Sequence, residues 1–230
     1  MSVAGCFLLC PKALNYGRHR ANQSQKKADE ISDKVDEAVA NSNESGIIKE
    51  NRKKPITKIT DLAIERVPEI KIDGYSSEQC LIIQNQHKEL LRYSKQNNNN
   101  NEVAFVFRKD LMNRENFLGK DDILELGTGL LGKGNELFVM HNHPRNSSYS
   151  VTDLILFKNY NNIKTLTIVK NNGNVEYITK GNSLDSKKFK FEFDRLYRKI
   201  VLTDSDAEKN KFVKALLTKT KSGVIWSERK

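Results

Sequence analysis

The sequence predicts an α/β layered domain, because expected strands and helices alternate through the middle of the chain. Short apolar stretches bounded by polar or turn-forming residues are typical of buried strands. Four such stretches occur, at residues 102–107, 136–140, 163–169 and 175–178. The last two are separated by Asn171-Asn172-Gly173, residue types that favour the positive φ of a hairpin turn.

The helices are predicted from capping residues and from the spacing of apolar side chains. One helix is expected from Ser76 or Ser77 to about Lys95, with Ser76-x-x-Gln79 as a capping box. A second helix, also capped by serine, is expected from about Ser150 to Tyr160. Residues 185–220 are predicted to form one or two basic helices. Their apolar residues recur at helical spacing, at Phe189, Phe193, Leu196, Tyr197 and Ile200 and at Phe212, Leu216 and Leu217.

The charge divides the chain into three parts. A length of 230 residues allows one well-packed domain with extensions, and the net charge is +10. Residues 1–60 hold 11 Lys+Arg and 7 Asp+Glu, residues 61–184 hold 15 of each, and residues 185–230 hold 13 and 7. We therefore expect a basic, partly helical or disordered segment and linker at 1–56, a neutral domain at 57–184 and a basic helical extension at 185–230.

The N-terminal segment carries no motif that assigns a function. Ile31, Val35 and Val39 permit only a thin amphipathic helix, and the scarcity of apolar residues around them favours a solvated state. Cys6 and Cys10 lack a second ligand pair and are interpreted as incidental apolar residues. Three cysteines in the chain are too few for a disulfide framework, which indicates a reducing, cytoplasmic compartment. No apolar run approaches the roughly 18 residues that span a bilayer, so an integral membrane protein is not expected.

The segment from His141 to Asp153 carries the candidate chemistry. His141 and His143 lie two residues apart at the end of an expected strand, so their side chains point to the same side of the sheet. Pro144 stiffens the exit from the strand, and Asp153 comes from the first turn of the next helix. Two histidines and one carboxylate, with a fourth position open to water, are typical of a catalytic zinc site. The alternative is a pair of surface histidines followed by an ordinary helix N-cap, and the joint spacing favours the metal site.

A hydrolytic zinc site also needs a proton acceptor that is not a ligand. Glu102 is the candidate, because it stands at the head of a strand that can lie beside the histidine strand. Ser150 can donate a hydrogen bond to the oxyanion that forms on an attacked carbonyl.

The signature His141-x-His143-Pro144, five residues, then Ser150-x-x-Asp153 resembles the JAMM (JAB1/MPN/Mov34) metalloprotease motif. The segment HNHP, residues 141–144, resembles the RadC-like branch of this family, which is found in bacteria, phages and mobile elements. The resemblance covers roughly residues 100–180. It implies a three-layer α/β fold like that of cytidine deaminases, with a mixed sheet and flanking helices. It also implies zinc on His141, His143 and Asp153, Glu102 as the general base and Ser150 at the oxyanion.

The sequence departs from this family in two places. The gap between Pro144 and Ser150 is one residue shorter than in typical RadC proteins. A Gly-rich stretch at 108–135, expected to be an irregular loop or insert, also separates the glutamate strand from the histidine strand differently. Competitors for the base are therefore Glu115, Glu125 and Glu136.

The expected function is that of a zinc metallohydrolase, which cleaves an amide or isopeptide bond of a peptide or protein substrate with metal-activated water. The alternative is a nucleic-acid-associated accessory protein of a phage or mobile element that uses the basic ends. The contiguous His141-Asn142-His143 is not the site of an HNH nuclease, whose residues are spread over a ββα-metal unit. The His-x-Glu and Pro-Cys-x-x-Cys motifs of zinc deaminases do not occur.

Overall fold

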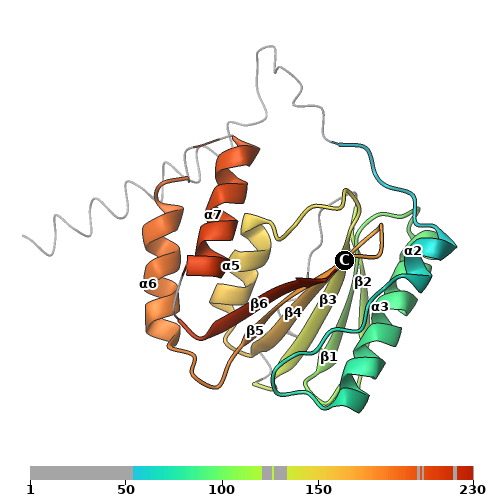
Figure 1. Ribbon diagram of the computed structural model, residues 1–230, viewed down its shortest axis with the longest axis horizontal. Helices are drawn as coiled ribbons and strands as arrows, with labels where there is room; N and C mark the ends of the chain where they lie inside the picture. The colour runs from blue at the N-terminus through green and yellow to red at the C-terminus, as the bar shows by residue number, and fades with distance from the viewer. Residues whose placement is uncertain are drawn as a thin grey trace, which may run out of the picture. The chain divides into compact units, whose positions relative to one another are not determined.

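The protein was analysed as a computed structural model, which describes residues 54–120, 126, 134–200, 203, 205–219 and 222–229. Within these residues the chain builds a six-stranded sheet with the order β2-β1-β3-β4-β5-β6 (Figure 1). Its strands are β1 (Val103–Arg108), β2 (Glu115–Leu118), β3 (Leu137–His143), β4 (Ile163–Lys170), β5 (Val175–Lys180) and β6 (Val224–Arg229). The sheet is mixed, because β3 and β4 are parallel and all other neighbours are antiparallel.

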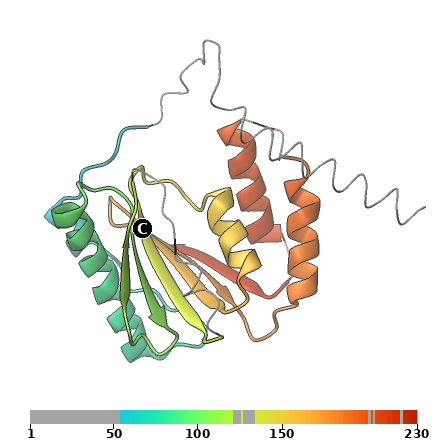
Figure 2. The ribbon, with the colours of Figure 1, turned by 180° about the vertical axis from the view of Figure 1, so that it is seen from behind.

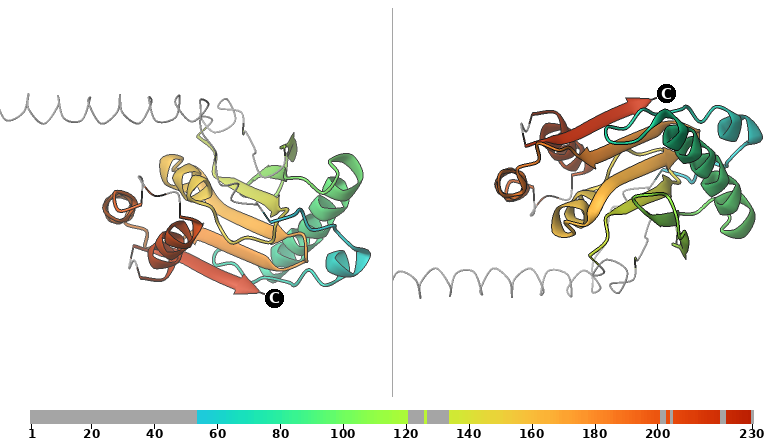
Figure 3. Two further views of the ribbon diagram at one scale, coloured as in Figure 1. Left: turned by 90° about the horizontal axis from the view of Figure 1, so that it is seen from above. Right: turned by 90° about the horizontal axis from the view of Figure 1, so that it is seen from below.

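Helices cover both faces of this sheet. Figures 1 and 2 show it from opposite sides, and the views from above and below in Figure 3 show the same layers. On one face lie α2 (Asp61–Glu65) and α3 (Ser77–Asn97), and on the other lie α5 (Val151–Asn159), α6 (Ser186–Tyr197) and α7 (Asp206–Lys219). Each face has its own apolar core, with Ile83, Leu90 and Phe105 on the α3 side and Val139, Leu154 and Phe193 on the α5 side. The expected α/β architecture with a mixed sheet is confirmed.

The connection from β3 through α5 to β4 positions the candidate site. Because β3 and β4 are parallel, α5 must run back across the face of the sheet between them. The N-terminus of α5 therefore lies at the carboxyl end of β3, where His141 and His143 stand. Ligand sites of α/β sheets are usually found outside the carboxyl ends of strands.

The local signals in the sequence predict most of these elements correctly. Ser76 caps α3 in a complete capping box with Gln79, and Ser150 caps α5 in the same way with Asp153. All four expected strands form. The strand expected at 136–140 begins at Leu137 and extends through both histidines to His143.

Three elements were not predicted from the sequence. Each is short, is exposed, or pairs with a strand that lies far away in the sequence. Strand β2 forms inside the stretch at 108–135 that was expected to be an irregular loop, and α2 is a short helix capped by Thr60. Residues 185–230 were expected to be a helical extension, but this prediction covers only α6 and α7. After α6 and α7, strand β6 returns to pair with β5 as an edge of the sheet, and the helices pack into the α5-side core.

Several predictions concern residues outside those that the structure describes, namely the helix around Ile31, Val35 and Val39 and the cysteines Cys6 and Cys10. Residues 54–230 form one compact unit. In the described part of the chain, no helix has both the length and the apolar composition needed to cross a membrane.

Candidate metal centre

Strand β3 places His141 and His143 together on one face of the sheet. Their Nε2 atoms are 2.8 Å apart, and both side chains are buried. They face the side covered by α5, because Val139, two residues earlier on the strand, belongs to the apolar core on that side. The intervening Asn142 points to the opposite face. The predicted convergence of the two imidazoles is therefore present in the structure.

Asp153 reaches the histidines from the first turn of α5. Its Oδ1 lies 3.3 Å from Nε2 of His141, and its Oδ2 lies 3.5 Å from Nε2 of His143. The capping box orients the carboxylate, since the backbone N–H of Ser150 donates to Oδ2 at 2.7 Å and the N–H of Asp153 donates to the Ser150 hydroxyl at 3.1 Å. A motif that caps the helix thus also aims its acidic residue at the histidines.

Glu102 approaches the same histidines from the neighbouring strand. Ala104 of β1 pairs with His141, and because β1 and β3 are antiparallel, Glu102 lies along the same register towards His143. Residues two apart on a strand share a face, so the Glu102 side chain lies on the histidine side. Its Oε1 is 3.7 Å from Nε2 of His141, and its side chain is buried.

The competing glutamates lie elsewhere or outside the described residues. Glu136 immediately precedes β3, at the end of the strand opposite to His143, and pairs with Lys109 at 2.6 Å. Glu115 is an exposed residue of β2. Glu125 lies outside the residues that the structure describes. Of the glutamates named as candidates, the structure brings Glu102 to the histidines.

The four side chains fit a small cation with nitrogen and oxygen ligands. Two ligand atoms on a tetrahedral zinc ion lie about 3.3 Å apart, given bond lengths of about 2 Å. The nearest distances between donor atoms of this cluster, 2.8 to 3.7 Å, span that value. One atom each from Glu102, His141 and His143 lies within 4.8 Å of the others, and Asp153 contacts both histidines. Either carboxylate could complete a set of three ligands.

The electrostatics of the site favour a positive charge between these groups. Burial by itself lowers the pKa of His143, but the hydrogen bond and charge of Asp153 and the charge of Glu102 outweigh it, and the net pKa is raised. Burial likewise raises the pKa of the Asp153 carboxyl, but the two histidines hold it well below its usual range. Carboxylates that stabilise an imidazolium here would stabilise a metal cation in the same way.

Ser147 is a site residue that the sequence did not indicate. The Nδ1 atom of His143 lies 3.1 Å from the backbone oxygen of Ser147 and 3.0 Å from its hydroxyl. A proton held on Nδ1 by these acceptors leaves Nε2 with a free lone pair, which is the tautomer that a metal ligand needs. The only signal was the short distance in sequence between Ser147 and His143.

Asn142 was also missed, although it stands between the two histidines. Its Oδ1 accepts the backbone N–H of Val103 at 2.7 Å, and its amide donates to Oδ1 of Asn171 at 2.8 Å. Asn171 in turn donates to the backbone oxygens of Thr57 and Asn100. Asn142 therefore connects the histidine strand to the start of the glutamate strand. The signal in the sequence was a polar residue between two histidines on a strand expected to be buried, since buried polar groups need hydrogen-bond partners.

Ser150 contacts Asp153 through its side chain as well as through its backbone. Its hydroxyl donates to Oδ2 of Asp153 at 2.7 Å, so it orients this carboxylate. The same oxygen also accepts the Ser150 backbone N–H. The carboxylate would therefore keep one donor if the hydroxyl turned towards a substrate.

A half-open pocket of about 350 Å³ leads to the cluster. Its lining combines the four side chains described above with apolar side chains. The lining residues are Glu102, Leu126, Val139, His141, His143, Pro144, Arg145, Ser147, Ser150, Thr152, Asp153, Leu156 and Tyr160. The volume is within the range of small-molecule and peptide side-chain sites.

Comparison of the chain with protein-family models, with curated proteins and with solved structures finds no match.

Proposed function

We propose that this protein is a zinc-dependent hydrolase of peptide or isopeptide amides, of the JAMM/RadC-like type that its motif resembles. The observation that carries the proposal is the convergence of His141, His143, Asp153 and Glu102 in one pocket. His141, His143 and Asp153 come from positions that the motif specifies, and Glu102 is the glutamate that lies beside them.

In this proposal His141, His143 and Asp153 hold the metal. Asp153 is preferred to Glu102 as the third ligand, because it contacts both histidines and does so at shorter distances. Two nitrogens and one carboxylate oxygen suit zinc, although the same set is also found on iron(II). Zinc bound there would polarise the substrate carbonyl and lower the pKa of a water molecule.

The side chains of the chain itself then move protons and orient groups. Glu102 accepts a proton from the attacking water and passes it to the amide nitrogen. The carbon–nitrogen bond then breaks, and the nitrogen leaves as an amine. The Ser150 hydroxyl turns from Asp153 to donate to the carbonyl oxygen as negative charge develops there. Ser147 keeps the Nε2 atom of His143 unprotonated.

Metal content tests the binding half of the proposal. The full-length protein, purified without added metal and analysed by mass spectrometry for all transition metals, is expected to carry about one zinc per chain. The double variant His141→Ala/His143→Ala should lose it. His87→Gln is the matched control, because His87 lies on α3, on the opposite face of the sheet, and the variant should retain the zinc. Wild-type protein with iron in place of zinc, or unchanged zinc in the double variant, contradicts the assignment.

Hydrolysis of a peptide mixture, followed by mass spectrometry of the new termini, tests the catalytic half. Glu102→Gln is expected to keep the zinc and to lower the rate by roughly 10² to 10⁴, the contribution typical of a general base. Loss of zinc in this variant would make Glu102 a ligand rather than the base.

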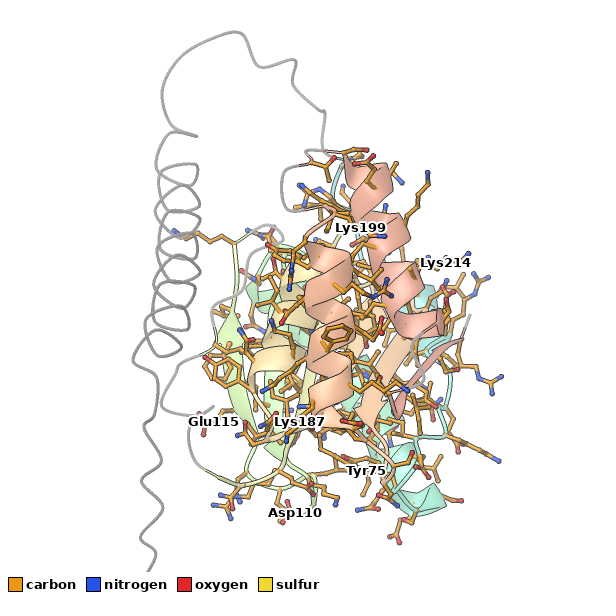
Figure 4. All side chains as sticks on the ribbon, turned by 90° about the vertical axis from the view of Figure 1, so that its left-hand side faces the viewer. Tyr75, Asp110, Glu115, Lys187, Lys199 and Lys214 are labelled. Carbon is orange, nitrogen blue, oxygen red and sulfur yellow. The ribbon has the colours of Figure 1, made fainter. Side chains whose placement is uncertain are left out.

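Nucleic-acid binding is a second candidate, and it rests on one face of α6. The side chains exposed there and directly after the end of the helix are Lys187, Lys188, Phe191, Arg195, Arg198 and Lys199. Phe191 is 64% exposed amid these cations. Figure 4 shows Lys187 and Lys199 at the two ends of α6 and Lys214 on the adjacent α7. Cations around an exposed aromatic ring can contact phosphates and stack on a base.

Fluorescence anisotropy with a labelled single-stranded DNA tests this second candidate. Affinity should fall steeply with salt and should be lost in Lys187→Glu/Lys188→Glu/Arg198→Glu. The matched control reverses three exposed cations elsewhere, Arg66, Lys71 and Arg108, and should bind as the wild type does. Absence of binding at low salt rejects the candidate.

A further inference from the structure

We infer that the apolar wall of the pocket is a substrate subsite that receives a hydrophobic side chain next to the scissile amide. This inference rests on the proposed function and specifies its substrate class: amides flanked by an aliphatic or aromatic residue. The relevant residues are Val139, Leu156 and Tyr160, which line the pocket together with the candidate metal ligands.

The apolar wall continues from the same two elements that supply the candidate ligands. On α5, Leu156 lies three residues after Asp153, so the two share one face of the helix, and Tyr160, the C-cap residue, follows four residues further. On β3, Val139 precedes His141 by two residues and points to the same face of the sheet. A group that reaches the candidate ligands therefore has apolar surface directly beside it.

The hydrogen bonding at the end of α5 holds this wall in place. The backbone N–H of Tyr160 donates to the oxygen of Leu156 at 3.1 Å. The ammonium group of Lys180, on β5, donates to the backbone oxygen of Tyr160 at 2.7 Å and lies over the ring of Phe157. Val139 is bracketed in the sheet by Val106 of β1 and Leu166 of β4. The subsite is built before a ligand arrives, which favours selective binding.

Burial of apolar surface predicts how selectivity should depend on size. Each methylene group moved from water into an apolar site strengthens binding roughly fourfold. A ligand that is anchored at the metal centre and carries a growing alkyl chain should gain this factor until the subsite is full.

Alkyl hydroxamic acids provide the probe, because the hydroxamate group binds zinc whatever the alkyl chain attached to it. Dissociation constants of acetohydroxamic, butanohydroxamic and hexanohydroxamic acid are measured by calorimetry on the zinc-loaded, full-length protein. We expect roughly fourfold tighter binding per added methylene. Leu156→Ala should remove most of this gain and leave the affinity for acetohydroxamic acid unchanged.

Ile155→Ala is the matched control. Ile155 is a half-buried aliphatic residue of the same helix and packs against the same core as Leu156, but it does not line the pocket. It should keep the full dependence on chain length. If Leu156→Ala does not fold, Leu156→Gln serves in its place, because it keeps the size of the side chain but puts a polar amide in the apolar wall, and the wild-type series by itself still tests the inference.

The outcomes separate this inference from the proposed function. Failure of the protein to bind zinc, or of the zinc-loaded protein to bind acetohydroxamic acid, overturns the proposed function and this inference with it. Binding of acetohydroxamic acid with no gain for the longer chains overturns the subsite alone. An equal loss of the gain in both alanine variants also overturns it, because the effect would then come from the core and not from the pocket.

Discussion

His87 shows how burial controls a single titratable residue. It lies on α3, fully buried against the face of the sheet opposite to the candidate metal centre, and its Nε2 is 2.8 Å from the hydroxyl of Thr167. Its Nδ1 makes no hydrogen bond within the described part of the chain. Burial lowers the pKa of His87 to about 3. The fold therefore accommodates only the neutral imidazole.

This burial predicts acid destabilisation. The unfolded chain takes up a proton at His87 near the ordinary pKa of about 6.5, whereas the folded chain resists it until about pH 3. The unfolded state thus binds more protons than the folded state between these limits. The free energy of unfolding therefore falls by about 1.4 kcal/mol for each unit by which the pH is lowered. Urea unfolding at about pH 7.5 and about pH 5 gives the loss of the free energy of unfolding on acidification. This loss should be smaller by about 2 kcal/mol in His87→Gln than in the wild type. An unchanged loss contradicts this explanation, and His19→Gln is the control.

A second prediction at this scale concerns Ser147. Removal of its hydroxyl in Ser147→Ala leaves only the backbone oxygen to accept from Nδ1 of His143. We expect zinc affinity to fall by about tenfold, the lower end of the range for groups that support metal ligands. Competition with a chromogenic chelator measures it. Ser148→Ala removes the adjacent hydroxyl, which donates to Glu176, and should leave the affinity unchanged.

At the scale of elements, an ion-paired cluster joins three strands to the loop that follows β3. Lys170 of β4 lies 2.6 Å from Glu176 of β5 and 3.0 Å from Glu228 of β6. The other oxygen of Glu176 accepts from the hydroxyl of Ser148 at 2.6 Å. Burial lowers the pKa of Lys170, but its hydrogen bonds and charge interactions with the two glutamates outweigh this, so the net pKa is raised. The cluster ties the edge strand β6 to the centre of the sheet.

Glu176→Gln is therefore expected to destabilise the fold. Its side chain is 1% exposed, so the substitution leaves Lys170 with one glutamate at the rim, at a cost of roughly 2 to 4 kcal/mol in the free energy of unfolding. The double variant Lys170→Met/Glu176→Gln removes the uncompensated charge and should recover a large part of the loss. Urea unfolding of all three proteins measures this, and equal stability of the single and double variants would contradict it.

At the scale of the whole molecule, all parts of the candidate centre lie within one compact unit. Residues 54–230 contain the four converging side chains, Ser147 and both apolar cores. A fragment of residues 54–230 is thus expected to fold and to bind zinc with the affinity of the full chain. Circular dichroism and the chelator competition would show it. A folded fragment that binds no zinc would mean that residues 1–53 contribute a ligand, with Cys6 and Cys10 the first candidates.

The distribution of charge is also a property of the whole molecule. The net charge of +10 belongs to the two ends of the sequence, whereas residues 61–184 are neutral. The structure places part of the C-terminal charge on the exposed face of α6, away from the apolar residues Phe189 and Phe193 that hold the helix in the core. The charge therefore bears on a possible nucleic-acid surface and not on the reaction proposed for the pocket.

Local patterns in the sequence account for the features that depend on neighbours along the chain. Alternation along a strand puts His141 and His143 on one face, and the capping box at Ser150 places Asp153 in the first turn of α5. Period, cap and turn residues act over a few positions, so the main strands and helices could be predicted from them.

The remaining features depend on contacts between residues that lie far apart along the chain. The pairing of β1 with β3 brought Glu102, and not Glu115 or Glu136, to the histidines. Strand β6 exists because β5 offers it an edge, and its half-exposed residues carry little signal of their own. The closing of the loop after β3 aimed Ser147 at His143, and the packing of α5 on β3 made the apolar wall of the pocket. Register, loop closure and packing are contacts between distant segments, and local preferences do not specify them.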